Sequence, residues 1–294
     1  MKEAENQILA SGEIPDEQYY PLKRVSNSKL KFLTECPNSY RESWRADMKE
    51  TKAMKFGKMF HCYILEEHEF WNRYFLIDTS QRPEPERTML AQRNKDWKAL
   101  LVERAKAAGL IEITEKELDK CIKMKESISR EPATWVLTDT PGEVEFGHVW
   151  EEEVEYYHPK LHKNQIEFVE MKLKADKIID VEGSRIIWDL KTVNNLAKWG
   201  RHSLEFGYHR QAALYSDTLD AHEYFVIAVE TKFPYNVGVW KATPALLELG
   251  RNGDPGGPGP SWGYKPLLRM LCQLRALYGT EFDAKSASMS TMGW

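Results

Sequence analysis

This sequence of 294 residues has little cysteine, no long apolar run and no excess of positive charge. Its four cysteines form no C-x-x-C pair, which argues against a zinc knuckle or a disulfide framework and predicts a reduced, intracellular chain. No apolar signal core opens the sequence, and no apolar run approaches the roughly 20 residues of a membrane helix. The formal net charge of −4 means that any contact with nucleic acid needs a local basic groove. We therefore expect a cytoplasmic protein without a membrane partner.

The length allows one large α/β domain with a substantial core. Residues up to about 140 read mainly as helix, and the clearest start signal is a capping box from Thr114 to Glu117. Beyond that point apolar residues alternate or run together, as they do in strands. The predicted parts are a flexible arm (1–25) and a single domain (26–280) made of a helical part (26–140), a sheet core (141–245), a Gly/Pro-rich loop (246–265) and a C-terminal helix (266–280), followed by a disordered tail (281–294).

Two apolar-periodic helices are predicted in the N-terminal part. The stretch SNSKLKFLTECPNSYRESW begins a helix capped by Ser26 or Ser28, with Leu30 and Leu33 facing inward. The stretch FGKMFHCYILEEHEF forms a second helix, which carries His61. The fold class that follows is α/β, a mixed central sheet flanked by helices with a helical N-terminal elaboration.

Acidic and basic side chains interrupt two apolar strands around the sequence DVEGS. A hairpin closed by residues 181–184 would pair Asp180 with Arg185 and Asp176 with Asp189. Directly opposed residues have Cβ atoms about 4.5–5.5 Å apart, so two carboxylates there destabilise the sheet unless a cation lies between them. An ion that prefers oxygen ligands, such as Mg²⁺, is the natural occupant.

Lys191 lies two residues beyond Asp189 on the same face, next to this expected metal. An ammonium group there can orient metal-bound water and stabilise charge that develops on a phosphate. This is chemistry for hydrolysing a phosphodiester. The alternative is a surface hairpin whose polar face is only solvated, and the spacing alone does not decide, because Asp-x-Lys occurs three times in the chain.

Further patterns accompany the hairpin. The stretch QAALY places Gln211 and Tyr215 on one face of the following helix, and GKMFH places His61 four residues after a glycine. With KAD and DLK, these patterns resemble the RecB-type branch of the PD-(D/E)XK nuclease superfamily. The similarity is greatest to the exonuclease domains of the RecE type (exonuclease VIII) and their phage relatives, over roughly residues 25–245. The positions that match the motifs are Gly57, His61, Asp176, Asp189, Lys191, Gln211 and Tyr215.

This resemblance implies a metal-dependent DNA exonuclease that is processive on duplex ends. It also implies a homo-oligomeric ring, trimeric or tetrameric, which works with a single-strand annealing protein in recombination, in a bacterial or phage-infected cell. Mg²⁺ or Mn²⁺ would be bound by Asp176 and Asp189, together with the carbonyl of Leu190 and with His61. Lys191 and the two acids would be catalytic, and Gln211 and Tyr215 would hold Lys191 or the DNA backbone.

The sequence departs from the family pattern in three ways. Alanine precedes Asp176 where the superfamily name has proline, and HPKLHKNQ replaces a short turn between strands. The upstream acidic ligand therefore stays open; Glu153 fits best by position, and the candidates are Glu151, Glu152, Glu153 and Glu155. Related CRISPR-associated exonucleases hold an iron–sulfur cluster with cysteines grouped near the C-terminus. Only Cys272 lies in that half here, so no cluster is predicted.

Candidate contacts to DNA phosphates are Arg41 and Arg45, although a solvated helix face explains them equally well. Tyr215 is a third candidate. The leading functional hypothesis is a Mg²⁺-dependent exonuclease acting on duplex DNA ends. An endonuclease of the same superfamily and a catalytically silent DNA-end-binding scaffold are the alternatives. A scaffold has no physical need for clustered carboxylates, which favours an enzyme.

Overall fold

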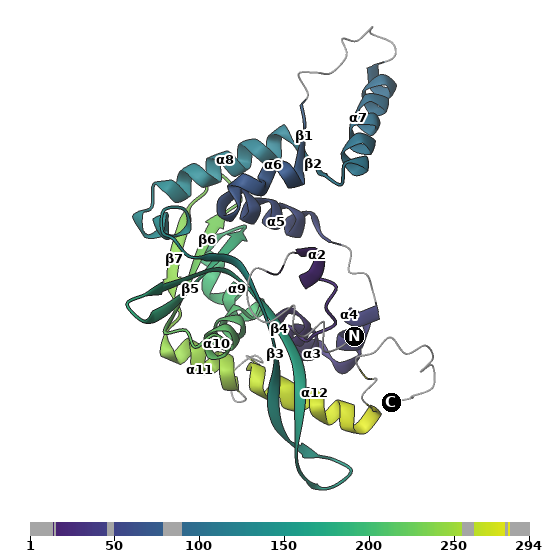
Figure 1. Cartoon of the computed structure of the whole chain (residues 1–294), viewed down its shortest axis with the longest axis vertical. Helices are drawn as coiled ribbons and strands as arrows, with labels where there is room; N and C mark the ends of the chain where they lie inside the picture. Colours follow the sequence, from purple (N-terminus) through teal and green to yellow (C-terminus); the bar gives the residue numbers. More distant parts are fainter. Residues whose placement is uncertain are drawn as a thin grey trace.

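A computed structural model describes residues 14, 16–45, 50–78, 90–254, 262–279 and 282, without the side chains of residues 16, 17, 45 and 90–94. Figure 1 shows a central sheet with helices around it and a long hairpin that extends from the body. The elements in chain order are α2 (Asp16–Tyr19), α3 (Asn27–Glu35), α4 (Pro37–Arg45), α5 (Lys52–Leu65), η1 (Glu67–Glu69), α6 (Phe70–Arg73), β1 (Tyr74–Ile77), α7 (Leu90–Ala107), β2 (Ile111–Thr114), α8 (Glu115–Ser129), η3 (Pro132–Leu137), β3 (Glu143–His158), β4 (Lys163–Val181), β5 (Ser184–Val193), η4 (Leu196–Lys198), α9 (Trp199–Glu205), α10 (Tyr208–Thr218), β6 (Glu223–Glu230), β7 (Val237–Lys241), α11 (Pro244–Asn252) and α12 (Tyr264–Tyr278).

The main sheet has five strands in the order β3-β4-β5-β6-β7. All neighbours are antiparallel except β5 and β6, which are parallel and joined through η4, α9 and α10. The predicted α/β architecture, a mixed sheet flanked by helices, is confirmed. Strand β5 is central and nearly continuous in apolar residues, as a strand covered on both faces should be. Asp189 and Lys191 interrupt that apolar run.

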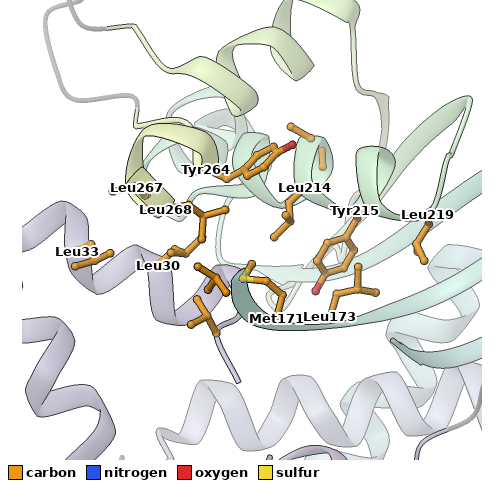
Figure 2. Close-up of a cluster of buried hydrophobic side chains, with 14 of the residues drawn as sticks. Leu30, Leu33, Met171, Leu173, Leu214, Tyr215, Leu219, Tyr264, Leu267 and Leu268 are labelled. Atoms are coloured by element: carbon orange, nitrogen blue, oxygen red, sulfur yellow. The ribbon is translucent and has the colours of Figure 1, made fainter. Parts of the chain in front are cut away.

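Two hydrophobic clusters cover the two faces of the sheet. One joins α3, α10 and α12 to β4 and β5, and Figure 2 shows its side chains packed between these elements. The other joins α5, α6 and α8 to β5 and β6. Strand β5 alternates between them, because Ile187 belongs to the first cluster and Trp188 and Leu190 to the second. Asp189, the one acid of β5, is therefore held at a position that packing on both faces of the strand fixes.

The predicted β4–β5 hairpin is confirmed in its register. Asp180 pairs with Arg185, and Val181 pairs with Ser184. The two residues between the strands, Glu182 and Gly183, both have positive φ, 50° and 81°. This is the backbone that a tight two-residue hairpin turn requires, and glycine adopts it without steric cost.

Strands β3 and β4 form one long antiparallel hairpin of 16 and 19 residues, which extends away from the body in Figure 1. Its inner face packs on α12 through Val154 and Tyr156, which are buried. On the opposite face Ile166 and Phe168 are exposed. They lie opposite Glu155 and Glu153 in the register, so these two glutamates are on the outer face of the hairpin.

The structure corrects several predicted segment boundaries. Residues 244–252, assigned in part to the Gly/Pro-rich loop, form helix α11, because the Thr243 side chain caps the N–H of Leu246 and Pro244 occupies the first turn. A second helix, α4, follows the predicted α3, and β1 and β2 pair as a small parallel sheet that was not predicted. The predicted tail, apart from residue 282, lies outside the described residues.

The predicted flexible arm is packed against the sheet over its described part. Ile14 is buried, and Val25 pairs with Met171 of β4. The buried Lys172 donates hydrogen bonds to the carbonyls of Tyr19, Tyr20 and Leu22 at 2.9, 3.2 and 2.9 Å. Burial lowers the pKa of Lys172 to about 8. The remaining arm residues lie outside the described part. None of the helices that the structure describes is long and apolar enough to cross a membrane.

Candidate active site

The candidate site lies where β4 and β5 separate. Their pairing ends at Lys177 and Trp188, and the next residue on each strand is an acid, Asp176 on β4 and Asp189 on β5. The N–H of Leu190 donates to Oδ2 of Asp176 at 2.7 Å and so fixes this carboxylate across the opening. The predicted register thus brings the two acids to the same end of the hairpin.

Glu145 of β3 faces Asp176 and was not predicted. It lies between the pairs Val144–Lys177 and Phe146–Ala175, but the ladder is interrupted at this position and Glu145 has a φ of 50°. A positive φ is uncommon for a residue with a side chain, and such backbone strain concentrates at functional sites. Here it turns the carboxylate toward Asp176.

His61, Glu145 and Asp176 form a set that suits a divalent cation. One ligand atom from each lies within 4.8 Å of the others, and Nδ1 of His61 lies 3.5 Å from Oδ1 of Asp176. Burial, together with the charge of Asp176, raises the pKa of Glu145. A cation bound between Glu145 and Asp176 would offset both the repulsion of the two carboxylates and the cost of burying their charge. Carboxylate oxygens favour Mg²⁺ or Mn²⁺, whereas an imidazole nitrogen is also a ligand for softer divalent metals.

Helix α5 brings His61 to the opening between β4 and β5. Its N-cap Thr51 accepts from the N–H of Met54, and its apolar stripe, which includes Phe60 and Ile64, packs into the second hydrophobic cluster. At Gly57, one turn before His61, a Cβ atom would lie 3.6 Å from Oγ1 of Thr192 in β5. The helix therefore runs directly against the strand that carries Asp189.

Asp189 and Lys191 form a buried ion pair beside the cation set. Nζ of Lys191 lies 2.6 Å from the carboxylate of Asp189, which is only 2% exposed. The same carboxylate accepts from Nε2 of Gln211 at 2.8 Å and from the hydroxyl of Tyr224. Burial opposes the charged form of Lys191, but the charges of Asp189 and Asp176 outweigh it and raise the pKa. Lys191 is therefore an ammonium at neutral pH.

Asp189 is surrounded by donors in this structure, and the cation shared by Asp176 and Asp189 stays a prediction. The prediction was that Asp176 and Asp189 share a cation, whereas the structure brings Glu145 and His61 to Asp176 and directs Asp189 toward Lys191, Gln211 and Tyr224. The two groups remain neighbours, since the charge of Lys191 acts on Asp176. In this arrangement Asp189 holds Lys191 beside the cation set.

Helix α10 positions Gln211 and Tyr215 differently from the prediction. Gln211 holds Asp189 and not Lys191. Tyr215 is buried in the core shown in Figure 2, and its hydroxyl bonds to the backbone of Lys174, so it is not available to DNA. The hydrogen bonds of Gln211 and Tyr215 therefore link α10 to β5 and to β4.

The other predicted site residues lie away from this cluster or outside the description. Glu153 is exposed on the outer face of the β3–β4 hairpin, opposite Phe168. It is eight residues along β3 from Glu145, which corresponds to about 26 Å at 3.3 Å per residue, so Glu145 takes the place of the upstream acid. The guanidinium of Arg41 lies 5.9 Å from the centre of the Phe282 ring. The side chain of Arg45 is outside the described part.

Lys174 and Tyr224 also belong to the site and were missed. Nζ of Lys174 lies 2.9 Å from Oε2 of Glu145, and Tyr224 contacts Asp189 from β6. Lys174 is two residues before Asp176 on β4 and lies on the same face of the strand, so the strand period gave a signal for it. Tyr224 stands in a strand that reads only as core, and its role depends on the parallel pairing of β5 and β6.

We predict that proton and metal compete at His61. Burial opposes its charged form, but the adjacent Asp176 outweighs burial and raises the pKa above 6.5. Protonated His61 then stabilises the metal-free protein below about pH 6.5, and this contribution is lost as the pH rises through the raised value. The melting temperature in EDTA should therefore fall over this range, and less steeply for His61→Gln. Stabilisation by Mn²⁺ should grow with pH in the parent protein. Identical pH profiles for the two proteins would contradict the assignment.

Comparison with known families and structures identifies the family and the fold of the chain. A family model described as "PDDEXK-like domain of unknown function (DUF3799)" matches residues 26–253. A solved structure from Eubacterium rectale, named "Putative exonuclease", is 15% identical over 90% of this chain and 86% of its own, with a TM-score of 0.55. A second structure, SSO0001, is 13% identical over 70% of this chain and 88% of its own, with a TM-score of 0.28, too low to support an argument. Comparison with curated proteins finds no match.

The matched region runs from the start of α3 to the end of α11 and so contains His61, Glu145, Asp176, Asp189 and Lys191. The likeness to the Eubacterium rectale structure at this low identity concerns the fold. Because the family model covers most of the chain, this protein belongs to the family of PDDEXK-like domains.

Proposed function

We propose that this protein is a metal-dependent nuclease that hydrolyses phosphodiester bonds from the ends of duplex DNA. The observation that carries the proposal is the meeting of a cation-binding set, Glu145, Asp176 and His61, with the ammonium group of Lys191. The RecE-type resemblance extends the proposal to DNA processing in recombination. As an exonuclease that holds duplex ends mainly through phosphates, the enzyme would act without sequence preference.

The chemistry divides between the two groups of residues. A bound divalent ion, held by Glu145, Asp176 and His61, would polarise the phosphate and lower the pKa of a bound water. Lys191 presents its ammonium at the same opening and stabilises negative charge that develops on the phosphate. Asp189 keeps this ammonium in place, and Gln211 in turn fixes the carboxylate of Asp189.

The first turns of α5 supply positive charge near the opening. Lys52, Lys55 and Lys58 are exposed on this helix, with Lys58 paired to Glu50 at 2.9 Å, and no acid lies in the first turn of the helix. Positive side chains at a helix N-terminus are unfavourable for the helix itself, because they oppose its dipole. They suit contacts with a phosphate backbone, which a chain of net charge −4 needs from a local surface.

The test is digestion of linear and covalently closed circular duplex DNA of the same sequence. In Mg²⁺ the linear form should be degraded and the circle left intact, and EDTA should abolish degradation. Cutting of the circle would identify an endonuclease instead. Binding of linear DNA without degradation in either Mg²⁺ or Mn²⁺ would indicate a silent end-binding protein and refute the proposal.

A further inference from the structure

The loop between β6 and β7 presents Phe233 to solvent. Its side chain is 86% exposed, more than that of any other large apolar residue in the described part of the chain. The neighbouring Tyr235 instead packs against the second hydrophobic cluster. One aromatic ring of this loop therefore points inward as an anchor and the other points outward.

Hydrogen bonds hold this loop in one shape. The N–H of Glu230 donates to the carbonyl of Asn236 at 2.9 Å, and the N–H of Tyr235 donates to the carbonyl of Lys232 at 2.7 Å. Nδ2 of Asn236 donates to Oε2 of Glu230 at 2.8 Å. Phe233 is therefore exposed on a turn whose shape is fixed by hydrogen bonds.

The loop is also fastened to the end of β5, the strand of the active site. The N–H of Thr231 donates to the carbonyl of Val193 at 2.8 Å, and its hydroxyl lies 3.2 Å from Oδ1 of Asn194. The N–H of Leu196 donates to Oε1 of Glu230 at 2.8 Å. A movement of the loop would therefore have to carry this segment with it.

The distance from Phe233 to the site corresponds to a few nucleotides. Lys191 pairs with Ala228 and Val193 with Glu230, so the loop begins two residues beyond Lys191. Two strand residues span about 7 Å, the step from β5 to β6 adds about 5 Å, and the three residues to Phe233 add at most about 11 Å. A duplex advances about 3.4 Å per nucleotide of each strand, so Phe233 lies within about seven nucleotides of the phosphate at Lys191.

The surroundings of Phe233 suit nucleic acid. Lys232 is exposed next to it, and Lys198 is exposed just beyond the anchored Leu196. The carboxylate of the nearby Glu230 is occupied by Asn236 and by the N–H of Leu196. An outward aromatic ring next to an exposed lysine combines base stacking with phosphate contacts, the pattern of single-stranded nucleic-acid binding.

We propose that Phe233 stacks on a base whose face is free at the DNA end that is held in the active site. In the interior of a duplex each base is covered on both faces by its neighbours, so a ring stacks there only by unstacking a base step, whereas a terminal pair or an unpaired nucleotide already offers a free face. This inference rests on the proposed nuclease function. It assigns the β6–β7 loop the task of holding the end in register with Lys191.

The test measures binding of blunt and single-strand-tailed duplexes with 2-aminopurine at the terminal base or in the tail, in metal-free buffer. Phe233→Ala should weaken binding of one or both DNAs roughly 5- to 150-fold, as loss of one base–aromatic stack implies. Phe233→Trp should retain affinity. The 2-aminopurine fluorescence should be quenched by the parent protein and not by Phe233→Ala, and the position that is quenched tells a terminal pair from an unpaired base. Phe168→Ala, which removes another exposed phenyl ring on the β3–β4 hairpin, is the matched control.

The outcomes separate this inference from the function on which it rests. If the parent protein binds both DNAs and Phe233→Ala binds and quenches equally, the stacking contact is refuted and the nuclease proposal stands. If the parent protein binds no DNA and degrades none, the nuclease proposal fails and the stacking contact fails with it. Equal loss of binding in Phe168→Ala would also overturn the assignment to Phe233.

Discussion

Lys191→Ala is expected to degrade linear duplex DNA about 10²–10³-fold more slowly than the parent protein while it stays folded and still binds DNA ends. The ammonium of Lys191 is held at 2.6 Å from Asp189, at the opening that also contains Asp176. Its removal takes away charge that acts on the developing phosphate and leaves the set of Glu145, Asp176 and His61 intact.

The stability of this variant separates a catalytic lysine from a purely structural ion pair. A buried carboxylate that loses its only partner costs about 3–5 kcal/mol, but Asp189 keeps Gln211 and the hydroxyl of Tyr224 as donors. We therefore expect a moderate decrease in melting temperature and unchanged stabilisation by Mn²⁺. Thermal melts with and without Mn²⁺, run beside a digestion assay, measure both. A variant that cuts at the parent rate, or one that does not fold, would overturn the assignment.

Glu145→Gln is expected to lose metal binding and activity without loss of fold. The substitution removes one of two carboxylates of the cation set, and even residues that only support ligands change metal affinity about 10- to 100-fold. We therefore expect metal affinity at least about 100-fold weaker. The melting temperature in EDTA should be unchanged or higher, because burial and Asp176 raise the pKa of Glu145 and make its charged form unfavourable. The lost partner of Lys174 acts in the opposite direction.

The measurement for Glu145→Gln is the thermal shift caused by Mn²⁺. A ligand at 100 times its dissociation constant stabilises a protein by about 2.7 kcal/mol, so the parent should show a clear shift and the variant little. Glu153→Gln is the matched control, since it lies on the same strand but faces solvent. A parent-like Mn²⁺ shift in Glu145→Gln, or an equal loss in Glu153→Gln, would refute this ligand assignment.

The β4–β5 hairpin could be predicted from the sequence because its turn is short. Two residues, Glu182 and Gly183, close the hairpin, and a two-residue turn fixes the register of the strands on both sides. The placement of Asp176 and Asp189 at one end of the hairpin followed from that register. Local information was sufficient for this half of the site.

Glu145 could not be found in this way because its position depends on a longer connection. Strands β3 and β4 are joined by a turn without a two-residue signature, and the register that puts Glu145 opposite Asp176 has to be counted from that turn over the whole hairpin. The glutamate-rich stretch around Glu153 offered more candidate ligands, but Glu153 is exposed on the outer face of the hairpin. For Tyr215, helical spacing gave the shared face with Gln211 and not its burial in the core.

The packing of the N-terminal segment has a consequence for biosynthesis. Tyr19 is held by Lys172, and the two are 153 positions apart in the chain. A ribosome adds about 5–20 residues per second, so Tyr19 is synthesised roughly 8–30 seconds before Lys172. Until then the apolar side chains of the segment, including Ile14 and Tyr19, have no sheet to cover. This segment is therefore made well before the strand that holds it and is among the last to reach its native place, and truncation before β4 would leave it without that partner.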